Sequence, residues 1–268
     1  MKKIELLAPA GDLEKLKIAI EYGADAVYCG GDIFSLRADS GRMTPTELEE
    51  GVRFAHDRGK KVYLTVNIFA HNDDIDNLNE YMKRISDIPV DAYIVTDPGI
   101  IFWFKENLPD AELHLSTQSN TTNYKSALFW HNQGIKRIIL ARELSLAEIK
   151  YIRQYTPDTL ALEAFVHGAM CISYSGRCLL SNFMVGRDAN QGKCAHSCRW
   201  KYNLVEEKRP GEAYPIFEDQ RGSYILNSKD LCMIEHIPEL IDSGLQSLKI
   251  EGRNKSIFYV ASVVGAYR

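Results

Sequence analysis

Short apolar runs rich in β-branched residues alternate along this chain with longer amphipathic stretches. A bounded apolar run of four to eight residues is typical of a buried strand, whereas apolar residues recurring every three or four positions are typical of a helix that faces a core. The runs therefore predict eight strands, at Ile4–Ala8, Ala26–Cys29, Lys61–Val66, Ala92–Thr96, Glu112–Ser116, Arg137–Ala141, Leu162–Val166 and Ser247–Ile250.

Helices are predicted in most of the gaps between these strands. Three of them follow residues that cap helix N-termini well, namely Asp12, Thr44 and Ser145. The predicted helices are Leu13–Tyr22, Thr46–Arg58, Ile75–Ser86, Gly99–Glu106, Tyr124–Gln133 and Leu146–Tyr155.

Strands that alternate with helices pair in parallel through right-handed crossovers, and eight of them can close into a (β/α)₈ TIM-like barrel. A doubly wound open sheet is the alternative. The 268 residues suit a single barrel domain that includes a cysteine-rich insertion, residues 169–246, after strand seven. The segment Lys255–Arg268 has a helix pattern without a C-terminal cap, so we expect a further C-terminal domain beyond this chain.

The composition is that of an ordinary globular protein, with 45% hydrophobic and 25% charged residues. The net charge of -4 gives no overall positive field, so contact with a nucleic acid would need a local basic patch. Apolar stretches are too short for a secretory signal or a membrane span, which predicts a cytoplasmic protein without a membrane partner. In that reducing compartment, six cysteines favour metal binding or catalysis over disulfides.

Polar residues replace aliphatic ones where the predicted strands end. Any one of them could be a helix cap or part of a loop ion pair, but their convergence on one barrel rim indicates a site. Glu163 and Lys249 lie within strands seven and eight, where a barrel interior tolerates charges only if they are paired, so a structural ion pair is the other explanation for them. The residues at strand ends are Asn67, Asp97, Gln118, Arg142 with Glu143, His167, and Glu251 with Arg253.

Five cysteines follow the pattern C-x₆-C-x₁₅-C-x₃-C-x₃₃-C, whereas Cys29 is interpreted as a small core residue. Irregular all-thiolate spacing favours an iron–sulfur cluster over zinc, which is the alternative metal. Cys171 and His167 could instead form a thiol–imidazole pair for peptide cleavage. The clustered cysteines are Cys171, Cys178, Cys194, Cys198 and Cys232.

The segment Cys198-Arg-Trp-Lys-Tyr202 interleaves cations with aromatic residues. Such a segment can stack a nucleobase and hold its phosphate, although a short amphipathic strand packed on the barrel would explain it too.

The stretch Glu163-Ala-Phe-Val-His-Gly-Ala-Met-Cys-Ile-Ser-Tyr-Ser-Gly-Arg-Cys-Leu-Leu-Ser181 closely resembles the signature of the collagenase-like peptidase family of unknown catalytic type, the peptidase U family. Leu7-Ala-Pro-Ala-Gly-Asp12, Gly30-Gly-Asp-Ile-Phe-Ser-Leu-Arg-Ala38 and Leu248-Lys-Ile-Glu-Gly-Arg-Asn-Lys-Ser256 are also similar to that family. The resemblance covers nearly the whole chain.

The resemblance implies an oxygen-independent hydroxylase that carries a 4Fe–4S cluster and, in RNA-directed members, takes the hydroxyl oxygen from prephenate as cosubstrate. Known substrates are the wobble uridine of tRNA, a ribosomal RNA cytidine and a ubiquinone precursor. We expect 5-hydroxylation of tRNA wobble uridine, with tRNA as the partner, and a homo-oligomer or a hetero-oligomer with a paralogue. A collagenase-like peptidase and a cluster-bearing scaffold protein are the alternatives.

The resemblance also gives a role to the cysteines, and the positions of the polar residues in the predicted strands and at their ends give roles to the others. Four cysteines of such members bind the cluster, and Cys171, Cys178, Cys194 and Cys232 match best, with Cys198 as the alternative ligand. Arg142, Arg253 and Gln118 are the expected cosubstrate-binding residues. The expected catalytic residues are His167, Glu163, Lys249 and Glu251.

Overall fold

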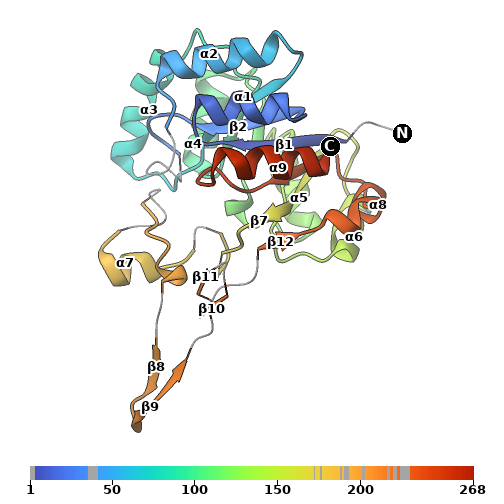
Figure 1. Cartoon of the computed structure of the whole chain (residues 1–268). Helices are drawn as coiled ribbons and strands as arrows, with labels where there is room; N and C mark the ends of the chain where they lie inside the picture. The colour runs from blue at the N-terminus through green and yellow to red at the C-terminus, as the bar shows by residue number, and fades with distance from the viewer. Residues whose placement is uncertain are drawn as a thin grey trace.

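Eight parallel strands close into a ring in the computed structural model of this chain (Figure 1). Consecutive strands β1 to β7 are neighbours, and β13 pairs with both β7 and β1, which closes the barrel. The structure describes residues 4–35, 42–171, 173–175, 177–187, 189, 193–200, 203–215, 218–219, 222–223 and 230–268. The barrel strands are β1 (Glu5–Ala10), β2 (Ala26–Gly30), β3 (Lys61–Val66), β4 (Ala92–Val95), β5 (Leu113–Leu115), β6 (Arg137–Ile139), β7 (Ala161–Gly168) and β13 (Ser247–Ile250).

Helices lie outside the ring and connect its strands. The side chains of Asp12, Thr44 and Ser145 each accept a hydrogen bond from a backbone N–H of the first turn, so all three expected caps are confirmed. The helices are α1 (Leu13–Glu21), α2 (Pro45–His56), α3 (Asn72–Arg84), α4 (Pro98–Asn107), α5 (Tyr124–Asn132), α6 (Leu146–Gln154), α8 (Ile237–Asp242) and α9 (Ile257–Tyr267).

Alternation along the strands separates two apolar layers. Leu6 and Ala8 of β1 point outward into the layer between strands and helices, whereas Leu7 points inward. The inner layer is small and contains Tyr28 and Tyr63. Because so few apolar residues fill the barrel, its interior has room for charged side chains.

The segment between β7 and β13 leaves the barrel. It contains α7 (Leu180–Val185), a hairpin of β8 (Asn203–Glu206) and β9 (Arg209–Pro215) that projects away from the barrel, and the short pair β10 (Glu218–Asp219) and β11 (Gly222–Ser223). The chain returns through β12 (Leu231–Cys232), which pairs antiparallel with the end of β7. The insertion expected at this place is therefore present, although α8, inside the range 169–246, belongs to the barrel's outer layer.

The predicted barrel is confirmed, and the open sheet is excluded because β7 pairs with both β6 and β13. Helix α3 begins three residues before the predicted Ile75, since the Asp74 carboxylate accepts the N–H of His71 at 2.8 Å and caps the helix there. None of the described helices combines the length and the apolar composition needed to cross a bilayer.

Candidate active site

A polar cavity of about 440 Å³, part of it open to solvent, lies at the carboxyl ends of the barrel strands. Enzymes with this fold place their active sites at that end. The cavity brings together most of the residues predicted from strand ends. The predicted residues that line it are Asn67, Gln118, Arg142, Lys249, Glu251 and Arg253.

Two of the residues predicted from strand ends lie outside this cavity. The carboxylate of Asp97 accepts the N–H of Gly99 at 2.7 Å and caps helix α4. Glu143 lies in the turn after β6 and does not line the cavity described here. For Asp97, the simpler explanation as a helix cap is thus confirmed.

Lys249 connects the cavity to a buried ionic cluster. Glu163 is completely buried, and its two carboxylate oxygens lie 3.0 Å from Lys249 Nζ and 3.1 Å from Arg137 Nη1. Arg137 also pairs with Glu5. Burial raises the pKa of Glu163, but the positive charges of Lys249 and Arg137 outweigh it and hold the pKa below its usual range. The carboxylate is therefore ionised, and the pairing expected for Glu163 and Lys249 is present; their catalytic roles stay predictions.

The ammonium of Lys249 is also held by aromatic rings. Its Nζ lies 4.1 Å from the ring centre of Tyr28 and 5.6 Å from that of Phe165, so both rings stabilise the charge. Burial lowers the pKa of Lys249, while the charge of Glu163 opposes that effect. The geometry fixes one positive charge at the inner wall of the cavity.

Arg253 forms a second part of the wall, and its guanidinium is held in place. Nη1 donates to Ser35 Oγ at 2.6 Å and to Thr65 Oγ1 at 3.2 Å. A Cβ at Gly30 would lie 2.6 Å from Ser35 Oγ and 3.1 Å from Arg253 Nη1, so only glycine leaves room for this approach. The residue before Ser35, Phe34, has φ 62°, a left-handed backbone conformation directly before the residue that contacts Arg253.

Arg142 and Gln118 complete the polar wall. Arg142 donates from Nη1 to the carbonyl of Ala169 at 3.0 Å and stacks 4.3 Å from the ring centre of Phe165. Its Nε and the Oε1 of Gln118 are buried and have no hydrogen-bond partner within the described part of the chain. Buried polar atoms without partners are costly, so these two are suited to a polar ligand. An anion would accept a hydrogen bond from Arg142 Nε, and a donor group on the same molecule would donate one to Gln118 Oε1.

His167 does not line this cavity. Strand β7 has an irregularity at this point, where the consecutive residues Lys249 and Ile250 of β13 pair with Phe165 and His167. The bulge turns the imidazole outward against α9, with Nδ1 3.3 Å from the hydroxyl of Tyr267. Burial lowers the pKa of His167. This position differs from the rim position expected from the sequence.

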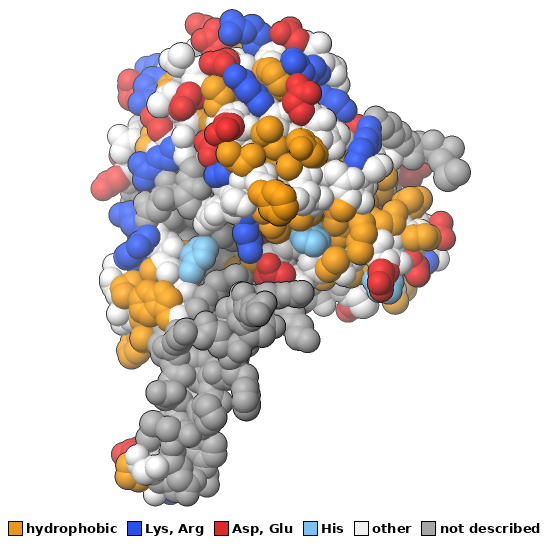
Figure 2. Space-filling model, viewed as in Figure 1, with side chains coloured by type: hydrophobic (Ala, Val, Ile, Leu, Met, Phe, Trp, Pro, Cys, Tyr) orange, Lys and Arg blue, Asp and Glu red, His pale blue; other side chains and the backbone are white. Residues whose placement is uncertain are grey.

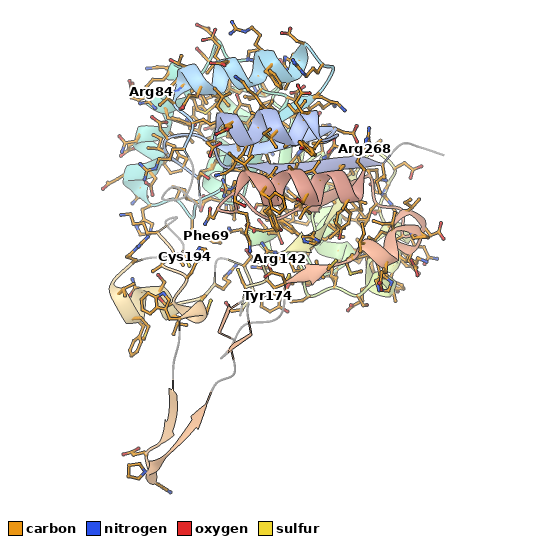
Figure 3. All side chains as sticks on the ribbon, viewed as in Figure 1. Phe69, Arg84, Arg142, Tyr174, Cys194 and Arg268 are labelled. Carbon is orange, nitrogen blue, oxygen red and sulfur yellow. The ribbon has the colours of Figure 1, made fainter. Side chains whose placement is uncertain are left out.

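The thiols differ in exposure. Cys29 is fully buried, as expected, and burial raises its pKa to about 12. The five clustered cysteines are exposed or half-buried. Figure 3 shows Cys194 in the part of the insertion that lies nearest the barrel.

Two of the clustered thiols accept backbone hydrogen bonds. The N–H of Leu180 donates to Cys178 Sγ, and the N–H of His196 donates to Cys194 Sγ, both at 3.4 Å. Such bonds stabilise thiolates that ligate a metal. The donor chemistry therefore fits an iron–sulfur cluster. In the described ranges, however, no three side chains of His, Cys, Asp or Glu lie close enough to share a metal ion, so the ligand set stays a prediction.

Sequence reasoning missed several residues of the site. Arg137 stands at the start of the predicted strand Arg137–Ala141, and an arginine at that position is a signal for a second buried ion pair. Ser35, Thr65 and Tyr28 gave no comparable signal, because only the closed barrel brings them to Arg253 and Lys249.

Comparison with known proteins agrees with this architecture. The family model of peptidase family U32 matches residues 11–268. Over its whole length the chain is 49% identical to tRNA hydroxylation protein P1 of Bacillus subtilis, and it covers 63% of that protein. It is also 41% identical over its whole length to tRNA hydroxylation protein P of Escherichia coli, of which it covers 68%. The structure of the U32 peptidase Mk0906 superposes with a TM-score of 0.59 at 15% identity, covering 94% of each chain, which supports the fold.

The fold and the site define a parallel α/β barrel protein with a basic, polar cavity at its mouth and a cysteine-rich insertion beside it. This chain belongs to peptidase family U32. It spans a little under two thirds of the length of the Bacillus subtilis relative.

Proposed function

We propose that this chain is the barrel part of a cytoplasmic RNA-modifying enzyme that hydroxylates C5 of the wobble uridine in tRNA. Prephenate is the source of the hydroxyl oxygen in this proposal, and cysteines of the insertion hold a 4Fe–4S cluster. Support for the RNA substrate comes from the relatives named tRNA hydroxylation proteins. Support for the anionic cosubstrate comes from the cavity.

The wall of the cavity carries the proposal. Arg142, Arg253 and Lys249 present cations to one space, and Lys249 is held there by the buried carboxylate of Glu163. Prephenate has two carboxylates, and guanidinium groups bind carboxylates through paired hydrogen bonds. Arg142 would bind one carboxylate through Nε, which is buried and has no partner within the described part of the chain. Arg253, fixed by Ser35 and Thr65, would orient the other.

The remaining residues have supporting roles. The amide of Gln118 would accept a hydroxyl of the bound molecule through its buried Oε1. Glu163 keeps Lys249 charged at the inner wall, where the ammonium would stabilise negative charge on the reacting molecule. Glu251, which is also buried at the wall, is the candidate for holding a proton.

The cluster would be held by Cys171, Cys178, Cys194 and Cys232, with Cys198 as the alternative ligand. A 4Fe–4S cluster supplies one-electron transfer. Two observations support that role. The thiols are exposed or half-buried, and the sulfur atoms of Cys178 and Cys194 each accept a hydrogen bond from a backbone N–H.

Nucleoside mass spectrometry tests the proposal. In a strain that lacks the gene, 5-hydroxyuridine derivatives should disappear from tRNA, and a plasmid with the full-length gene should restore them. Unchanged tRNA would contradict the proposal. Loss of hydroxycytidine from ribosomal RNA, with unchanged tRNA, would support RNA hydroxylation but make ribosomal RNA the substrate.

A further inference from the structure

Helix α7 carries an exposed apolar surface, which we call the α7 face and define as Leu179, Phe183, Met184 and Val185. Phe183 is 84% exposed and Leu179 is 70% exposed. Figure 2 shows these apolar side chains gathered in one patch, with basic side chains on the surface above it. A helix of six residues that presents such side chains to solvent is suited to bind a partner.

The charge around the α7 face points to the kind of partner. Between Glu163 and Glu206 the sequence has five basic residues and one acidic residue, a local net charge of +4 in a chain whose total is -4. Arg177, Arg187 and Lys193 are exposed. A basic segment with exposed aromatic side chains complements a polyanion that has flat bases. The basic residues of the segment are Arg177, Arg187, Lys193, Arg199 and Lys201.

The α7 face lies beside the mouth of the cavity. Ser175 lines the cavity, and Leu179 follows four residues later, within about 14 Å because an extended residue spans at most ~3.5 Å. Arg177 stacks on Phe69, in the loop after β3, with its guanidinium 5.5 Å from the ring centre. A nucleic acid strand with one base in the cavity would therefore have α7 within its reach.

We infer that the α7 face binds the single-stranded RNA loop that carries the target nucleotide. This inference rests on the proposed function. Phe183 stacks on an unpaired base next to the target, because a loop nucleotide that leaves its stack exposes the ring of its neighbour. Arg177 and Lys193 contact the adjoining phosphates. The apolar face thus selects unpaired RNA, and the cations retain it at the mouth.

Binding of a labelled anticodon stem-loop with a wobble uridine to the full-length protein tests this surface, with fluorescence anisotropy as the measurement. Phe183→Ala should weaken binding roughly tenfold, which is in the range for loss of one base–aromatic stack. Phe183→Trp should bind normally, whereas Phe183→Leu should bind weakly because it keeps the apolar surface without the flat ring. Phe258→Ala, which removes an 80% exposed ring from α9, is the matched control and should bind normally.

The salt dependence tests the phosphate contacts. Lys193→Ala should reduce the slope of log affinity against log salt by about 0.7, the value for one phosphate contact on a single strand. Lys83→Ala, an exposed lysine on α3, should leave the slope unchanged. Iron content and melting temperature, measured on every variant, should stay at the values of the parent protein.

Three outcomes separate the possible failures. If the parent protein hydroxylates tRNA but Phe183→Ala and Phe183→Leu bind the stem-loop as tightly as the parent, this inference is wrong and the proposed function stands. If the parent neither binds the stem-loop nor changes tRNA, the proposed function fails. If Phe183→Ala splits an oligomer in sedimentation without affecting RNA affinity, the α7 face is a protein interface.

Discussion

The ammonium of Lys249 lies 3.0 Å from Oε1 of Glu163, although the barrel encloses both side chains. Strand register explains the contact. Ser247 of β13 pairs with Glu163, and Lys249 lies two residues further on the same face, so its long side chain reaches back to the carboxylate. Two charges that share a buried site depend on each other, and removal of one leaves the other uncompensated.

We therefore expect Glu163→Gln to lower the free energy of unfolding by roughly 3–5 kcal/mol, because Lys249 then remains as a buried charge without its carboxylate. The double variant Glu163→Gln with Lys249→Met should recover much of that loss. Urea unfolding of the two single variants and the double variant measures the coupling. Strictly additive effects would show that the two charges do not stabilise each other.

A second prediction concerns the arginines of the cavity. Arg142→Ala should lower kcat/KM for the cosubstrate by roughly tenfold or more, as expected for a lost hydrogen bond to a charged group, and leave the iron content intact. Arg142→Lys should recover only part of the activity, since it restores the charge without the fork. Arg253→Ala should act in the same direction and also release Ser35 and Thr65.

Arg84→Ala is the control for these variants, because Arg84 lies on α3 outside the cavity and pairs with Asp32. It should keep normal kinetics. Normal turnover in both Arg142→Ala and Arg253→Ala would remove these arginines from the site.

The barrel could be predicted because its signal is local. Apolar runs such as Lys61–Val66 and caps such as Asp12 act within a few residues, and both were found where expected. The wall of the cavity is different. Ser35 holds Arg253 across 218 positions of sequence, a contact that exists only once the ring has closed.

His167 shows a second reason why sequence reasoning has limits. Regular alternation from Glu163 and Phe165 would point residue 167 into the barrel, but a bulge shifts the register by one residue. Nothing in the local sequence marks that bulge, because it arises where β7 must pair with β13 and also with β12.

The third prediction tests the thiols. Full-length protein purified without oxygen should bind about four irons per chain. Alanine at Cys171, Cys178, Cys194 or Cys232 should each remove most of the iron, and Cys198→Ala should remove less. Cys29→Ala serves as the matched control, since this thiol is buried in the barrel layer, and should retain the iron. Stoichiometric zinc without iron after anaerobic reconstitution would contradict the cluster.

A fourth prediction follows from His114, whose side chain is fully buried and lies 2.8 Å from Glu112 through Nε2. Burial lowers the pKa of His114 below its usual 6.5. The unfolded chain therefore takes up a proton before the folded protein does, and stability falls as the pH drops below about 6.5. The decline should approach ~1.4 kcal/mol per pH unit. Urea unfolding at several pH values should show it, and His114→Gln should flatten the curve. An equal slope in that variant would assign the proton uptake to another group.

The last prediction separates a hydrolase from a hydroxylase through His167 and Cys171. A thiol protease needs the imidazole as a base for the thiol, and loss of either residue would then abolish cleavage without affecting metal. In the described structure no hydrogen bond joins the two, and the imidazole instead contacts Tyr267 of α9.

The cluster proposal gives the two residues different effects. Cys171→Ser should lose iron and destabilise the insertion, because a ligated metal contributes folding free energy. His167→Ala should keep the iron. If the imidazole moves a proton in catalysis, the rate should fall by ~10²-fold or more. The contact with Tyr267 favours the other result, a small loss of stability with a near-normal rate. Phenylalanine at Tyr267 should cost more stability than His167→Ala, because the lost hydroxyl also donates to the carbonyl of Val166 and accepts the N–H of Met233. Full iron in Cys171→Ser, together with loss of a peptidase activity that the parent shows, would make the protease the correct function.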